Sequence, residues 1–139
     1  MSREPITVYV VDDDDSIRMA LERLLRSAGY HARTFESAEE FLEFAPKPDE
    51  GCLVLDIHLP KMTGLDLQEE LVSRGAKYAI IFMTAFHNPR WQKRAKKMGA
   101  VAYLRKPFKS QALIDAIDQC QLRRKGLSRS DGVVDPLSC

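Results

Sequence analysis

The sequence predicts a doubly wound α/β domain built on a five-stranded parallel sheet, and three observations support this fold class. Five short apolar runs alternate with five stretches of helical periodicity. The run from Cys52 to Leu55 has no polar alternation, as expected for a strand covered on both faces. The length of 139 residues suits one domain with a real core and is too short for two of ordinary size.

Each predicted strand is followed by a predicted helix. The strands are Thr7 to Val11, Tyr30 to Phe35, the run ending at Asp56, Tyr78 to Thr84, and Val101 to Leu104. The helices run from the aspartate cluster to Gly29, from Ser37 to Phe44, from Leu65 to Val72, from Pro89 to Gly99, and from Ser110 onward. Ser37 and Glu40 have the spacing of a capping box. We place Tyr30 to Phe35 near a sheet edge because it carries His31 and Arg33.

The composition excludes several classes of protein. A net charge of +1 argues against strong attraction of the whole molecule to nucleic acid or to a membrane surface. The cysteines Cys52, Cys120 and Cys139 are odd in number and form no CxxC, so we interpret them as reduced thiols of a cytoplasmic protein. No apolar run approaches the roughly 20 residues of a membrane span, and the N-terminus does not resemble a signal peptide.

Polar residues fall where the predicted strands end. Asp12 and Asp13 follow the first strand, Asp56 ends the third, Thr84 ends the fourth, and Lys106 follows the fifth. Parallel strands bring these ends to one edge of the sheet, which is where ligands bind in open α/β folds.

This set of side chains favours phosphoryl chemistry. Three crowded carboxylates would repel one another unless a cation is held between them. Ligands that are all oxygen suit Mg²⁺, which favours phosphate partners. A lysine and a hydroxyl at the same edge could bind phosphoryl oxygens. The residues therefore predict an aspartyl-phosphate site with Asp56 as the nucleophile.

Four segments, VVDDDDSIR, LVLDIHLPKMTG, IIFMTA and YLRKPF, resemble in this order the receiver domain of bacterial two-component response regulators. The resemblance implies a flavodoxin-like sheet with strand order 2-1-3-4-5. It implies a receiver domain over residues 1–122 and a polar tail or linker remnant over 123–139. The segments LVLDIHLPKMTGLDLQ and IIFMTA are similar to receivers that precede a helix-turn-helix output domain. We expect a receiver domain that either stands alone or is cut from a longer regulator.

The resemblance also implies how metal would be bound. Asp13 and the phosphoacceptor Asp56 would bind Mg²⁺ directly, joined by the backbone carbonyl of His58. Asp12 would order a metal-bound water. A cis peptide bond is expected between Lys106 and Pro107.

A phosphorylation switch follows from the same resemblance. Lys106 and Thr84 would contact phosphoryl oxygens, and Tyr103 would be the aromatic residue that responds. The phosphodonor would be a phosphohistidine on a sensor histidine kinase or phosphotransfer protein. The protein would catalyse only its own phosphorylation and dephosphorylation. The helix from Pro89, the strand Val101 to Leu104 and the helix from Ser110 would form the face that changes, with a homodimer as one output.

Two alternatives remain open from the sequence. One is a receiver-like interaction module that is never phosphorylated. The other is a phosphatase of the haloacid dehalogenase type, which needs an aspartate two residues after the nucleophile, where this chain has His58. We further hypothesise that His58 and Phe86 border the phosphoryl site and affect attack by water, and we expect His31 and His87 to be surface residues.

The helix from Pro89 carries five basic residues around a thin apolar stripe that includes Trp91. The basic residues are Arg90, Lys93, Arg94, Lys96 and Lys97. Such a run is typical of a solvated face, and it could also bind an acidic partner. It lacks the interleaved aromatic residues and the recognition helix of a nucleic-acid-binding domain.

Overall fold

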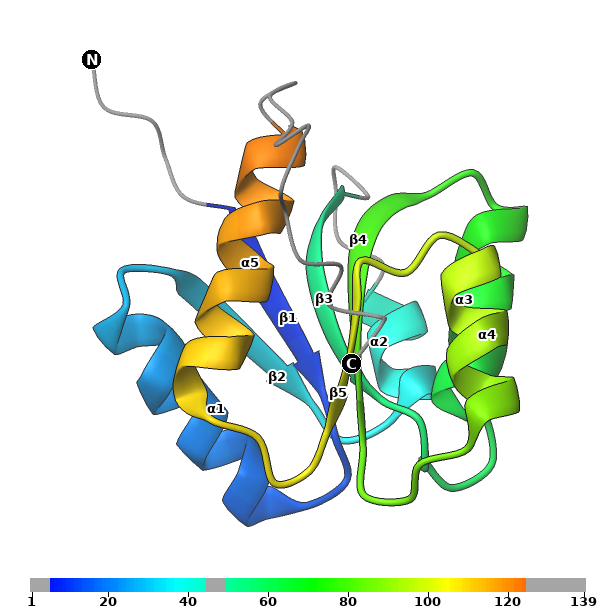
Figure 1. The fold of residues 1–139 in the computed structure, drawn as a ribbon, viewed down its shortest axis with the longest axis horizontal. Helices are drawn as coiled ribbons and strands as arrows, with labels where there is room; N and C mark the ends of the chain where they lie inside the picture. The colour runs from blue at the N-terminus through cyan, green and yellow to red at the C-terminus, as the bar shows by residue number, and fades with distance from the viewer. Residues whose placement is uncertain (1–5, 45–49, 125–139) are drawn as a thin grey trace.

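A computed structural model describes residues 6–44 and 50–124, and it contains a five-stranded sheet whose strand pairs are all parallel (Figure 1). The strand order is β2-β1-β3-β4-β5, which confirms the predicted fold class and order. The strands are β1 Thr7–Val11, β2 His31–Phe35, β3 Glu50–Asp56, β4 Lys77–Thr84 and β5 Ala102–Arg105. Strand β2 lies at an edge, as its exposed His31 and Arg33 led us to expect.

Five helices flank the sheet. They are α1 Asp15–Ser27, α2 Ala38–Phe44, α3 Gly64–Ser73, α4 Pro89–Lys97 and α5 Ser110–Arg124. Helices α1 and α5 cover one face, and α2, α3 and α4 cover the other (Figure 1). The predicted tail, residues 123–139, lies outside the described residues except for the last two residues of α5.

Side-chain caps fix where several helices begin. The Asp14 carboxylate accepts a hydrogen bond from the Ile17 amide at the start of α1 (3.0 Å). The Ser37 hydroxyl accepts from the Glu40 amide as predicted (3.0 Å), but the Glu40 carboxylate accepts from the Glu36 amide instead of closing the box on Ser37. A complete capping box occurs instead at α3, between Thr63 and Asp66.

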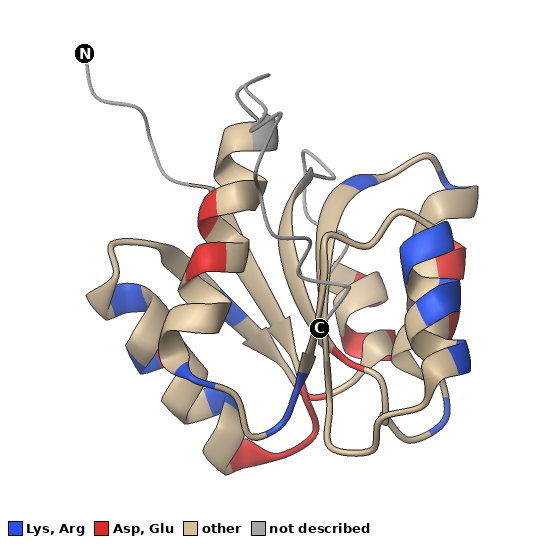
Figure 2. Cartoon of the chain, in the orientation of Figure 1, with Lys and Arg blue, Asp and Glu red and all other residues tan. Residues whose placement is uncertain are grey.

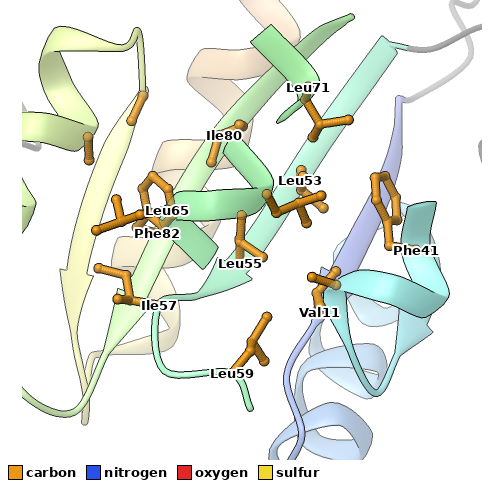
Figure 3. Packing of buried hydrophobic residues seen from close by; sticks show 14 of the residues in the cluster. Val11, Phe41, Leu53, Leu55, Ile57, Leu59, Leu65, Leu71, Ile80 and Phe82 are labelled. Atoms are coloured by element: carbon orange, nitrogen blue, oxygen red, sulfur yellow. The ribbon is translucent and has the colours of Figure 1, made fainter. Parts of the chain in front are cut away.

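The core consists of two apolar layers separated by the sheet. Strand β3 contributes to both, since Cys52, Leu53, Val54 and Leu55 are all 0% exposed. Figure 3 shows Leu53 and Leu55 packing with Ile80 and Phe82 of β4, side chains of α3, and Phe41 of α2. The central strands are therefore held rigidly. Within the described residues, no helix combines the length and apolar character needed to cross a membrane.

The register of the sheet brings the strand ends to one edge. Val11 of β1 pairs with Leu55 of β3, and Asp56 pairs with Met83 of β4. Asp12 directly follows Val11, and Thr84 directly follows Met83. Asp12, Asp56 and Thr84 therefore lie at the same edge of the sheet.

Gly64 allows the chain to fold back against Asp56 after β3. Its amide donates to the Ile57 carbonyl (2.9 Å), and a Cβ at this position would lie 2.4 Å from the Asp56 carbonyl oxygen and 3.0 Å from the Ile57 Cα. Both obstacles are backbone atoms, so a side chain can be accepted only if the loop beside Asp56 moves.

We expect Gly64→Ala to lower the free energy of unfolding by about 3 kcal/mol, because the overlap is with backbone. Gly75→Ala is the matched control: its Cβ would meet nothing within 4 Å, and only its φ of +74° is unfavourable, at about 1 kcal/mol. Urea unfolding measures both variants. Equal losses would show that the close approach at Gly64 does not constrain the loop.

Candidate functional site

The structure brings together the three carboxylates that the sequence singled out. Oxygen atoms of Asp12, Asp13 and Asp56 all lie within 4.8 Å of one another. Asp12 and Asp56 are buried, at 0% and 5% exposure, whereas Asp13 is exposed. The cluster therefore opens to solvent on the side of Asp13. Figure 2 shows the acidic turn that leads from β1 into α1 at this edge of the sheet.

Lys106 places a cation between the two buried carboxylates. Its Nζ lies 2.8 Å from an Asp12 oxygen and 3.4 Å from an Asp56 oxygen. Burial disfavours the charged ammonium, but Asp12 and Asp56 outweigh this effect and raise the pKa of Lys106 above its usual value. The Lys106 amide donates to the Thr84 carbonyl (2.7 Å), and the Lys106–Pro107 peptide bond is cis, as expected.

Negative charge exceeds positive charge around Asp56. Burial and the neighbouring Asp12 carboxylate raise the pKa of Asp56, while Lys106 and the His58 amide oppose them. That amide donates to Asp56 Oδ1 (3.0 Å). An additional cation would relieve the remaining repulsion.

The donor set fits a hard divalent cation. Its side-chain donors are carboxylate oxygens, and Asp13 leaves room for water ligands, which Mg²⁺ retains. Asp12 is already engaged with the protein: Oδ1 accepts from the Asp14 amide (2.9 Å) and Oδ2 accepts from Lys106. Both carboxylate oxygens of Asp12 therefore already accept hydrogen bonds from the protein.

The Thr84 hydroxyl is hydrogen-bonded within its own loop. Its fully buried hydroxyl donates to the Phe86 carbonyl (2.9 Å) and accepts from the Phe86 amide (3.1 Å). No hydrogen bond joins Thr84 to Asp56 within the described residues. The hydroxyl must leave the Phe86 carbonyl before it can donate to another acceptor.

Tyr103, the predicted switch residue, is 3% exposed and points into the domain. Its ring meets the His87 ring edge-on, with centroids 5.6 Å apart. We expected His87 to be a surface residue, and this was wrong. The side chain is half-buried, and its Nδ1 has no hydrogen-bond partner among the described residues. His31 is exposed, as expected.

Sequence reasoning placed His58 and Phe86 beside the site but missed the contact of His58 with Trp91. The His58 ring packs edge-on against Phe86 (5.3 Å between centroids) and against Trp91 (4.7 Å). The rings come from three separate segments, so no local periodicity links them. The positions of His58 and Phe86 just after strand ends indicated that both lie near the site. Nothing in the sequence indicated that Trp91 contacts His58.

The raised pKa of Asp56 predicts how stability changes with pH when metal is removed. A carboxyl group whose pKa is higher in the folded protein than in the unfolded chain contributes stability at low pH and loses it as the pH rises through the folded value. In EDTA we therefore expect Asp56→Asn to be more stable than the wild type at pH 7. The advantage should shrink at pH 4, because the wild-type carboxyl takes up its proton as the pH falls through its raised pKa.

Urea unfolding at both pH values measures this difference. Asp115→Asn, on an exposed face of α5, controls for the change in net charge. An Asp56→Asn variant that is less stable than the wild type at pH 7 would contradict the electrostatic account.

Known proteins share this fold, and the regions that match them include the residues of this site. A family model described as the response regulator receiver domain matches residues 8–118. The chain is 43% identical over 112 residues to the transcriptional regulatory protein TdiR of Thauera aromatica, covering 81% of this chain and 49% of that protein. It is 40% identical over 114 residues to the transcriptional regulatory protein FixJ of Azorhizobium caulinodans, covering 82% and 54%. The chain thus spans about half the length of these relatives.

Solved structures agree with the sequence relatives. The response regulator StyR superposes with a TM-score of 0.81 at 45% identity, over 89% of this chain and 64% of that one. The structure titled FixJ-N superposes with a TM-score of 0.78 at 33% identity, over 86% and 95%. The family match spans the acidic cluster, Lys106 and the whole sheet apart from Thr7. The chain therefore belongs to the response regulator receiver domains of two-component systems.

Proposed function

We propose that this receiver domain is a phosphorylation-activated switch whose phosphoacceptor is Asp56. The observation that carries the proposal is the clustering of the Asp12, Asp13 and Asp56 carboxylates, with the Lys106 ammonium group bound to Asp12 and Asp56. The phosphodonor is a phosphohistidine on a sensor histidine kinase or phosphotransfer protein, as membership of the family suggests.

Mg²⁺ would be held by Asp13, Asp56 and the backbone carbonyl of His58, with Asp12 reaching it through water. When bound, Mg²⁺ offsets the negative charge of the carboxylates and of the incoming phosphoryl oxygens. The excess negative charge around Asp56 supports this assignment.

The residues of the site act mainly by position and charge. A carboxylate oxygen of Asp56 attacks phosphorus, so that an O–P bond forms as the P–N bond to the donor imidazole breaks. The imidazole nitrogen keeps the electron pair and takes a proton from solvent. Lys106 then pairs with a phosphoryl oxygen. Dephosphorylation is a separate hydrolysis: water attacks the phosphorus and gives up a proton to solvent, the O–P bond to Asp56 breaks, and the Asp56 carboxylate and inorganic phosphate are released.

Phosphorylation would require the Thr84 hydroxyl to give up a hydrogen bond that it makes in the structure. A phosphoryl group adds about −1.5 to −2 charge and new acceptor oxygens. The Thr84 hydroxyl would exchange the Phe86 carbonyl for one of these oxygens. Tyr103 would then move with the loop that carries His87, since the two rings are in contact.

The face formed by α4, β5 and α5 would present the output. Basic side chains lie exposed along α4, where Figure 2 shows blue bands separated by tan. This face could support a homodimer or bind an acidic partner surface. Two relatives are named as transcriptional regulatory proteins, and both are about twice as long as the matched region. DNA binding in a longer regulator would therefore belong to another domain.

The test is intact mass after incubation with acetyl phosphate and Mg²⁺. We expect one phosphoryl adduct that is stable in acid and labile in base, as an acyl phosphate is. It should be absent in EDTA and in Asp56→Asn. Asp115→Asn, which removes an exposed carboxylate of α5, should retain it.

Two outcomes would contradict the proposal. An adduct that persists in Asp56→Asn would place the phosphoryl group on another residue. A wild-type protein that forms no adduct with acetyl phosphate or with a phosphohistidine donor would instead be an interaction module that is not phosphorylated.

A further inference from the structure

Three aromatic side chains beside the phosphoryl site form a cluster that we call the aromatic bracket. His58 comes from the loop after β3, Phe86 from the loop after β4, and Trp91 from the first turn of α4. The His58 ring stands nearly perpendicular to Phe86 (88°) and is tilted by 69° against Trp91. Edge-to-face packing of this kind is the favoured arrangement of aromatic pairs.

The backbone on two sides of the bracket is hydrogen-bonded to groups of the site. The His58 amide donates to Asp56 Oδ1, and both backbone groups of Phe86 bond the Thr84 hydroxyl. If the Thr84 hydroxyl donates to another acceptor, the Phe86 carbonyl therefore loses its hydrogen bond. Phe86 is 68% exposed, so its ring is held by few other contacts and can follow its backbone.

Helix α4 buries little of its own surface against the domain. Ala95 is its one buried residue among those described. The Gln68 side chain of α3 donates to the Ala95 carbonyl (3.2 Å), and Arg94 lies 3.7 Å from Glu69. An element with so little buried surface is easily displaced. The Trp91 ring is the aromatic contact that joins its first turn to the site.

We propose that Trp91 is a positioning residue, which through the aromatic bracket ties the first turn of α4 to the loops that carry Asp56 and Thr84. This inference rests on the proposed phosphorylation of Asp56. When the Thr84 hydroxyl leaves Phe86, the bracket rearranges and α4 is released from its position. Trp91 thus provides a route from the phosphoryl site to the face formed by α4, β5 and α5, separate from the contact between His87 and Tyr103.

Trp91 is the single tryptophan of the chain, so its fluorescence reports the bracket directly. The full chain is incubated with Mg²⁺ alone and with Mg²⁺ plus acetyl phosphate, and the emission spectrum is recorded. Intact mass measured on the same samples gives the phosphorylated fraction. The change in emission, divided by that fraction, is the response of Trp91 to phosphorylation.

Three variants distinguish the loss of a ring contact in the bracket from a general effect of truncating a surface side chain. Phe86→Ala removes one ring and should reduce the emission response by at least about half, because the moving loop then loses its ring contact. Phe86→Tyr keeps a ring and should retain the response. Val72→Ala, at a 49% exposed apolar residue of α3, is the control for truncation of a surface side chain and should behave as the wild type.

The outcomes distinguish this inference from the proposed function. An adduct with an unchanged emission spectrum would overturn the role of Trp91 and leave the phosphorylation of Asp56 standing. An equal response in Phe86→Ala and the wild type would also overturn it, because Trp91 would then respond by another route. Absence of the adduct in the wild type would overturn both proposals.

Discussion

The structure depends on one electrostatic constraint, the burial of two carboxylates that share a single ammonium group. Asp12 and Asp56 are almost fully enclosed, and Lys106 lies between them. Removing charged groups from water is costly unless they are paired and hydrogen-bonded. The sheet register, the close approach at Gly64 and the loop after β5 together hold these three groups in place.

A change in the hydrogen bonding of Thr84 would affect side chains on both sides of its loop. The Thr84 hydroxyl is hydrogen-bonded to Phe86 in its own loop. In that loop the Phe86 ring packs against His58, and the His87 ring packs against Tyr103. A phosphoryl group that recruits Thr84 would therefore disturb two sets of ring contacts at once. Packed contacts of this kind tend to have discrete arrangements, which suits a two-state switch.

Sequence patterns predicted the parts that follow local rules. The apolar runs and helical periodicities gave five strands and five helices, and parallel strand ends placed Asp12, Asp13 and Asp56 together. The strand order came from the family resemblance, because periodicity does not encode neighbours. The environment of His87 and the contact of His58 with Trp91 could not be predicted, since they join segments that are distant in the chain and depend on tertiary packing.

The most direct test of the central constraint is the free energy of unfolding of Lys106→Met, measured with EDTA and with Mg²⁺. The account predicts a loss of about 3 kcal/mol in EDTA, because two buried carboxylates are left without their cation. Mg²⁺ should restore much of this loss by binding the folded cluster. Lys109→Met, which removes an exposed lysine nearby, should be close to the wild type in both conditions. A Lys106→Met variant as stable as the wild type in EDTA would contradict the account.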